Sequence, residues 1–120
     1  MFVNFSNHES SLWPSAQIKA AKEFGEIIDI PFPPIPSEST ADEVNAVADE
    51  YSERIQKMGP AAVMCQGEFT LAYAVVSKLK TCGMTVVAAC SERRTVERVV
   101  NGVTQKSTVF EFKQFREYRG

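Results

Sequence analysis

Two short apolar runs, residues 61–65 and 85–90, flank a segment whose apolar residues recur at helical spacing. A continuous apolar run of this length is typical of a strand that is covered on both faces of a sheet. The residues on the inward side of the intervening helix are Leu71, Ala72, Val75, Val76 and Leu79. A strand, a helix and a strand in this order predict parallel strands joined by a right-handed crossover.

The rest of the chain continues this alternation and then departs from it. Thr40 and Glu43 form a capping box at the start of a helix that ends at Gly59. Asn101-Gly102 predicts a two-residue turn between two final antiparallel strands. The expected strands are residues 2–6, 26–30, 61–65, 84–90, 93–100 and 103–115, and the other expected helices are residues 14–24 and 68–82.

These elements predict an α/β fold with a mostly parallel sheet, flanking helices and a C-terminal β-hairpin. The length of 120 residues corresponds to one domain, and no repeat or linker divides it. We therefore expect residues 1–120 to form a single domain.

Composition and charge exclude several classes of protein. The net charge of -2 argues against binding of long nucleic acid, which usually needs a basic face. No apolar run is long enough for a membrane helix, and no signal peptide is visible. Three cysteines at unrelated spacings and one histidine predict no metal site and no cofactor, and they indicate a reducing cytoplasm.

Polar residues gather in the loop after the first expected strand, where an open parallel sheet binds its ligands. The single histidine, His8, is the natural general acid or base, because imidazole exchanges protons near neutral pH. Trp13 is expected either to stack on a base or to anchor the core. The side chains that we expect to bond a phosphate or a ribose, or alternatively to cap the following helix, are Ser6, Asn7, Ser10 and Ser11.

A second candidate loop, Gln66-Gly67-Glu68-Phe69-Thr70, joins a strand to a helix. Backbone N–H groups at such a junction can hold an anion, and Gly67 lets the chain turn sharply there. Glu68 would either favour the helix dipole or face a ribose hydroxyl or an adenine amino group. No Walker or dinucleotide-binding motif is present.

A third candidate loop carries Arg93 and Arg94, and arginine binds phosphate with two parallel hydrogen bonds. The alternative is a solvated pair on the hairpin. The final run of the chain carries Lys113, Arg116 and Arg119 among aromatic residues. One interpretation is a stripe that contacts nucleic acid, but we expect these charges to keep an edge strand soluble.

Four segments carry a resemblance to a known family: FVNFSNHESSLW, EFGEIIDIPFPPI, CQGEFTLAYAVVSKLK and TVVAACSERR. Together they resemble the small CRISPR-associated proteins of the Csx type, which are stand-alone relatives of the CARF (CRISPR-associated Rossmann fold) sensors. The resemblance implies a Rossmann-like domain and a role in antiviral defence. It also implies a homodimer that holds a cyclic oligoadenylate across its two-fold axis.

Some proteins of that group are ring nucleases, in which a ribose 2′-hydroxyl attacks the neighbouring phosphate without a metal ion. The resemblance therefore favours an enzyme here, with His8 and Ser11 as expected catalytic residues. Arg93, the third expected catalytic residue, and Arg94 are added on grounds of charge. The expected ligand-binding residues are Asn4, Ser6, Asn7, Trp13, Gln66, Gly67, Glu68, Thr70 and Arg94. Two alternatives stay open: a nucleotide sensor or sponge that does not cleave, and a self-associating interaction protein without a ligand.

Overall fold

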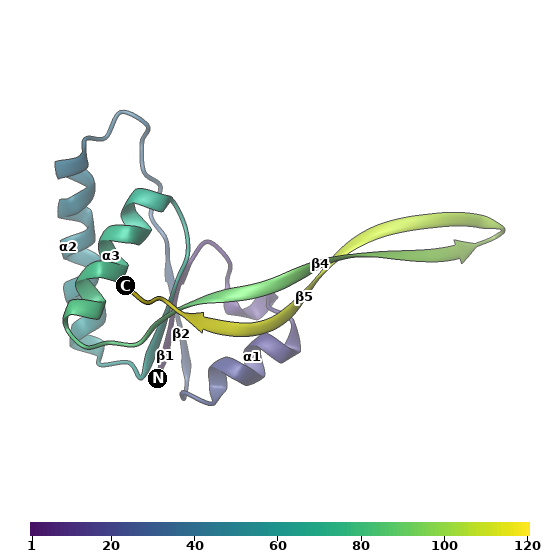
Figure 1. Cartoon of the computed structure of the whole chain (residues 1–120), viewed down its shortest axis with the longest axis horizontal. Helices are drawn as coiled ribbons and strands as arrows, with labels where there is room; N and C mark the ends of the chain where they lie inside the picture. Colours follow the sequence, from purple (N-terminus) through teal and green to yellow (C-terminus); the bar gives the residue numbers. More distant parts are fainter.

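One five-stranded sheet organises the chain, and the computed structural model describes all residues 1–120. Its strand order is β2-β1-β3-β4-β5 (Figure 1). The first four strands are parallel, and β5 pairs antiparallel with β4. The strands are β1 (Phe2–Ser6), β2 (Ile27–Pro31), β3 (Ala62–Cys65), β4 (Val86–Val100) and β5 (Val103–Glu117). The predicted α/β class, mostly parallel sheet and C-terminal hairpin are confirmed.

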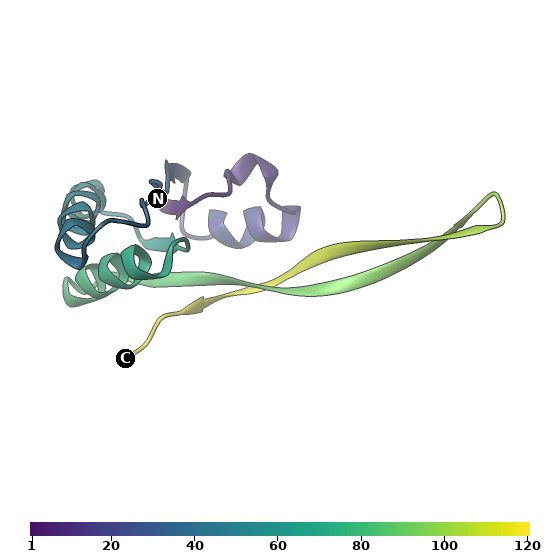
Figure 2. The same cartoon turned by 90° about the horizontal axis from the view of Figure 1, so that it is seen from above.

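Helices cover both faces of the sheet. Helix α1 (Ser15–Lys22) follows a short 3-10 turn, η1 (Ser10–Leu12), and lies on one face. Helices α2 (Ala41–Met58) and α3 (Phe69–Thr81) lie side by side on the other face (Figures 1 and 2). None of these helices is both long enough and apolar enough to cross a membrane.

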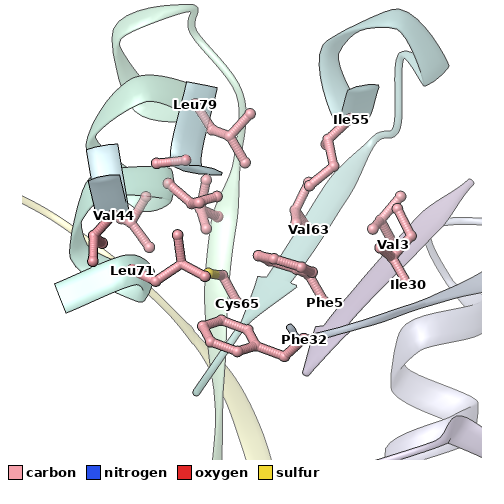
Figure 3. Close-up of a cluster of buried hydrophobic side chains, with 14 residues drawn as sticks. Val3, Phe5, Ile30, Phe32, Val44, Ile55, Val63, Cys65, Leu71 and Leu79 are labelled. Atoms are coloured by element: carbon pink, nitrogen blue, oxygen red, sulfur yellow. The ribbon is translucent and has the colours of Figure 1, made fainter. Parts of the chain in front are cut away.

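Each face of the sheet has its own apolar cluster. The larger cluster packs Val3, Phe5 and Val63 of the strands under α2 and α3 (Figure 3). On the opposite face, Phe2 and Met64 pack beneath α1. Neighbouring residues of β1 thus point to opposite covered faces, which explains why the inner strands read as continuous apolar runs.

The ends of the helices follow local chemistry. Thr40 and Glu43 form the predicted capping box, with hydrogen bonds of 3.1 Å in both directions. Gly59 ends α2 in the left-handed conformation, with φ 62°. The predicted helix 14–24 is shorter in the structure, because Pro14 has extended backbone and serves as the N-cap of α1.

The two strands predicted at residues 84–90 and 93–100 are one strand, β4. No glycine or proline interrupts the chain between Cys90 and Arg93, so a turn has nothing to start it. The only irregularity is a bulge in β5, where Lys113 has no partner because Cys90 pairs with Gln114 and Ser91 pairs with Phe112. The predicted turn at Asn101-Gly102 is confirmed, and both residues have positive φ.

Beyond Val87, the last residue of β4 paired with β3, the hairpin leaves the body of the protein. We call residues 91–112 the hairpin arm. It projects as a two-stranded ribbon (Figures 1 and 2), and the molecule measures 57 × 37 × 25 Å.

Candidate functional site

The candidate site lies where the direction of sheet winding changes. From β1 the chain passes through α1 to β2 on one side, and from β2 it returns through α2 to β3 on the other side. The carboxyl ends of β1 and β3 therefore form a topological switch point, the usual ligand position in such sheets. Gln66 N donates a 3.2 Å hydrogen bond to Phe5 O, so the two loops start side by side. We call this region the switch-point edge.

The backbone of His8 is held by buried polar side chains. Its carbonyl oxygen accepts hydrogen bonds from Asn4 Nδ2 at 2.8 Å and from Trp13 Nε1 at 3.2 Å. Its N–H donates to Ser6 Oγ at 3.2 Å, and Ser6 Oγ donates to Asn4 Oδ1 at 2.6 Å. The His8 side chain itself is exposed. Asn4, Ser6 and Trp13 thus act as positioning residues for a histidine that faces solvent.

Asp29 completes this network and was missed by the sequence analysis. It lies beside Asn4 in the pairing of β1 with β2, and its Oδ1 accepts from Asn4 Nδ2 at 2.9 Å. Its Oδ2 accepts from Ser10 Oγ at 3.0 Å. The available signal was a single carboxylate inside the apolar strand Ile27–Pro31.

The other members of the first loop divide into buried and exposed groups. Trp13 is only 8% exposed and packs edge-on against Phe2, with ring centroids 6.3 Å apart. Asn7 and Ser11 are exposed, and Ser11 Oγ makes only a long 3.5 Å contact with Glu9. Of the site residues predicted in this loop, Asn7, His8 and Ser11 remain available to a ligand.

In the second loop, the carboxylate of Glu68 caps its own helix. It accepts from the N–H groups of Leu71 at 2.9 Å and Thr70 at 3.1 Å, and from the Thr70 hydroxyl at 2.7 Å. These hydrogen bonds, the one from Leu71 N–H foremost, hold the pKa of the Glu68 carboxyl below its usual value. Glu68 therefore occupies the position at the start of α3 that a phosphate would take.

Gly67 and Gln66 have packing contacts that account for their presence. A Cβ on Gly67 would lie 2.6 Å from the ring of Phe32. The ring of Phe32 packs against that of Phe5 at a tilt of 33°, with centroids 4.8 Å apart, and fills the space beside β3 (Figure 3). Gln66 Oε1 accepts from Ala89 N at 2.7 Å and ties the loop to β4. The N–H groups of Gly67 and Glu68 have no acceptor within the protein.

The two arginines of the third predicted loop stand on the hairpin arm. Arg93 is six residues beyond Val87, or about 20 Å along the strand. Arg94 forms an ion pair with Glu111 at 3.1 Å, whereas Arg93 has no ion pair. The structure thus starts the first two predicted loops side by side and leaves the arginines outside them.

A separate hollow lies on the outer side of α3, away from the first loop. Its lining includes the exposed rings of Phe69 and Tyr73, together with Tyr118. Tyr118 donates a 2.8 Å hydrogen bond to Cys65 O, and burial raises the pKa of its phenol. Burial also raises the pKa of the Cys65 thiol to about 12, so this cysteine is a neutral core residue.

Comparison with known proteins assigns a family to this architecture. A family model described as "Uncharacterized protein MJ1673 family" matches residues 1–116. The chain belongs to this family. The MJ1673 family match spans the switch-point edge as well as the whole hairpin arm, so both features fall within the family's common region. No curated protein matches the chain.

Proposed function

We propose that this protein binds a cyclic oligoadenylate at the switch-point edge and cleaves it as a ring nuclease. The observation that carries the proposal is the network around His8. Buried Asn4, Ser6 and Trp13 fix the His8 backbone, while the His8 side chain is exposed to solvent. Fixing the backbone from which a proton-transfer group projects is one way in which positioning lowers a barrier. The resemblance to Csx-type proteins supports the choice of ligand.

In the proposed reaction, His8 removes the proton from a ribose 2′-hydroxyl. The 2′-oxygen attacks the neighbouring phosphorus, and the bond from phosphorus to the 5′-oxygen breaks. The proton passes to the leaving 5′-oxygen, which gives a 2′,3′-cyclic phosphate and a 5′-hydroxyl. Asn7 and Ser11, exposed in the same loop, are the proposed partners of the ribose and the phosphate.

The structure changes the roles that we assign to the other predicted residues. The free N–H groups of Gly67 and Glu68, rather than Arg93, are the donors that the proposal assigns to the phosphate. Asn4, Ser6, Trp13 and Gln66 act through the loops that they hold.

Binding without cleavage is a second candidate, and Glu68 favours it. Its carboxylate already occupies the start of α3, and neither loop contains a lysine or an arginine. A site with so little positive charge stabilises a developing negative charge poorly. A sensor or sponge needs only the contacts that bind the intact ring, and it does not need to stabilise the transition state of cleavage.

Incubation with cyclic tetra-adenylate or cyclic hexa-adenylate, followed by chromatography of the nucleotides, tests the proposal. We expect a linear product with a 2′,3′-cyclic end. His8→Ala should slow its formation by about 10²-fold or more while binding persists. Glu23→Ala, an exposed substitution beyond α1, is the matched control and should cleave normally. A ring bound but intact would favour the sensor, and no binding at micromolar protein would end both candidates.

We also propose a cytoplasmic location. All three cysteines are free thiols in the structure, and Cys82 is exposed. An exposed free thiol is compatible with a reducing compartment.

A further inference from the structure

The hairpin arm has an unpaired edge along β4. Up to Val87, β4 lies between β3 and β5, but beyond that residue it has β5 alone as a neighbour. A two-stranded ribbon is marginally stable by itself in water, and a free edge offers a ready template for another strand. The arm stands clear of the body in both views (Figures 1 and 2).

Hydrogen bonds at the base of β4 show which residues face this edge. Thr85 O accepts from Val63 N, and Ala89 N donates to Gln66 Oε1 on the β3 side. The N–H and C=O groups of successive residues point to alternate sides of a strand. Those of the odd-numbered residues of β4 therefore point toward the β3 side. The backbone groups that face the free edge of the arm are therefore those of Ser91, Arg93, Thr95, Glu97 and Val99.

We propose that a second copy of this chain pairs with the arm along this edge, β4 against β4 in antiparallel orientation, with Thr95 opposite the partner's Thr95. In this register Arg93 lies opposite the partner's Glu97, and Glu92 lies opposite the partner's Arg98. The two-fold axis repeats both pairs. The strand is thus complementary in charge to itself, and main-chain hydrogen bonds join the two ribbons into four strands.

Other registers place like charges together. The backbone N–H and C=O groups that face the edge in one strand must meet those that face the edge in the other, so the pairing can slide only by two residues at a time. Each such step moves the residue at the two-fold axis by one position. Centring the pairing on residue 94 opposes two copies of Arg94, and centring it on residue 96 opposes Arg94 with the partner's Arg98. Centring the pairing on residue 93 opposes the two copies of Arg93, and centring it on residue 97 opposes the two copies of Glu97. Like charges directly opposite are destabilising, so the charges select the register centred on Thr95.

Arg93 and Arg98 are the two arm cations without an ion pair in the single chain. In the proposed pairing they gain the carboxylates of Glu97 and Glu92, each of which forms one 3.5 Å ion pair, with Lys106 and Lys113, in the single chain. Val99, whose side chain is 73% exposed, would lie opposite the partner's Ser91, in line with the partner's Phe112. The apolar tip of each arm is thereby covered by the base of the other.

The pairing leaves the two switch-point edges at opposite ends of the joined arms. Each edge keeps a site of its own, faced by the tip of the partner's arm. A ring shared across the two-fold axis would need a different interface between the copies. The inference does not rest on the proposed function, since the interface is tested without a nucleotide.

Charge reversal tests the register by sedimentation velocity across a concentration series. The unmodified chain should dimerise, and Arg93→Glu or Glu97→Arg should each weaken the dimer by about tenfold or more. The double variant should recover it, because the opposing charges are exchanged. Arg54→Glu, an exposed substitution on α2 with the same charge change, should leave the dimer intact. A monomeric unmodified chain, or a dimer indifferent to these reversals, would overturn the proposal.

A cross-link provides a second test that does not depend on affinity. Two residues opposite each other in a sheet have Cα atoms about 5 Å apart, within the range of a disulfide. Thr95→Cys should therefore form a covalent dimer under mild oxidation. Thr108→Cys, opposite Thr95 within the same hairpin, should form no more dimer than the unmodified chain. Equal cross-linking of both variants would reject the β4 edge as the interface.

Discussion

The side-chain amide of Asn4 donates a 2.8 Å hydrogen bond to the backbone carbonyl of His8. The same nitrogen donates to Asp29 at 2.9 Å, so one buried residue connects two strands to the loop that carries the only histidine. A buried amide that is fully used in this way fixes the loop more firmly than exposed contacts could.

Asn4→Ala should destabilise the protein and impair the site together. It removes the 2.8 Å donor of the His8 carbonyl and the 2.6 Å acceptor of the Ser6 hydroxyl, and the loss of these buried hydrogen bonds costs about 2 kcal/mol of unfolding free energy. Urea unfolding measures this loss, and nucleotide chromatography measures the accompanying fall in cleavage. The exposed neighbour variant, Asn7→Ala, should unfold at the same urea concentration as the unmodified chain. Equal stability of Asn4→Ala and the unmodified chain would contradict the network.

Gly67→Ala should be destabilising because its new methyl group meets the ring of Phe32 at 2.6 Å. Phe32 is buried and packs against the ring of Phe5, so it cannot move aside freely. We expect a loss of about 1–3 kcal/mol, typical of overpacking. Phe32→Leu should recover part of this loss in a double-mutant cycle. Additive effects of the two substitutions would show that the contact does not limit residue 67.

Glu68 should contribute stability that depends on pH. Its pKa in the folded chain lies below its ordinary value of 4.5, so its capping contribution is fully present above pH 4.5. The contribution is lost as pH falls through the lower, folded pKa. Thermal unfolding at several pH values should show this loss in the unmodified chain and a reduced loss in Glu68→Gln. Identical pH profiles for the two chains would exclude the carboxylate as the cap.

The cysteines should react with a maleimide in a fixed order. Cys82 is exposed, whereas Cys65 is buried and its pKa is raised to about 12. At pH 7.5 the thiolate that reacts is therefore scarce at Cys65. Mass spectrometry of peptides should find Cys82 labelled in the folded protein and Cys65 labelled after unfolding. Labelling of Cys65 as fast as Cys82 would contradict its burial.

Structural features that depend on neighbouring residues could be predicted from the sequence. The capping box of Thr40 and Glu43, and the turn at Asn101-Gly102, depend on residues close in the chain, so their patterns predict them correctly. Strand and helix alternation likewise gave the sheet and its closing hairpin. The sequence analysis divided β4 into two strands because its apolar pattern changes where the strand leaves the body of the protein and becomes exposed. The backbone nevertheless continues as one strand.

The contacts that shape the switch-point edge could not be predicted from the sequence. Asp29 meets Asn4, and Phe32 meets Gly67, only because β2 and β3 flank β1 in the sheet. Spacing along the chain carries no such information. The same reason explains why Asn4, Ser6 and Trp13 read as ligand contacts, whereas the structure uses them to hold His8.

The lone histidine makes one measurement especially direct. Because the chain contains a single histidine, its imidazole proton signals in an NMR spectrum need no assignment. During titration with cyclic tetra-adenylate, these signals should shift and saturate as the site fills, in both the unmodified chain and Glu23→Ala. Signals that stay in place at millimolar nucleotide would show that His8 does not meet the ring, and the proposed site would be wrong.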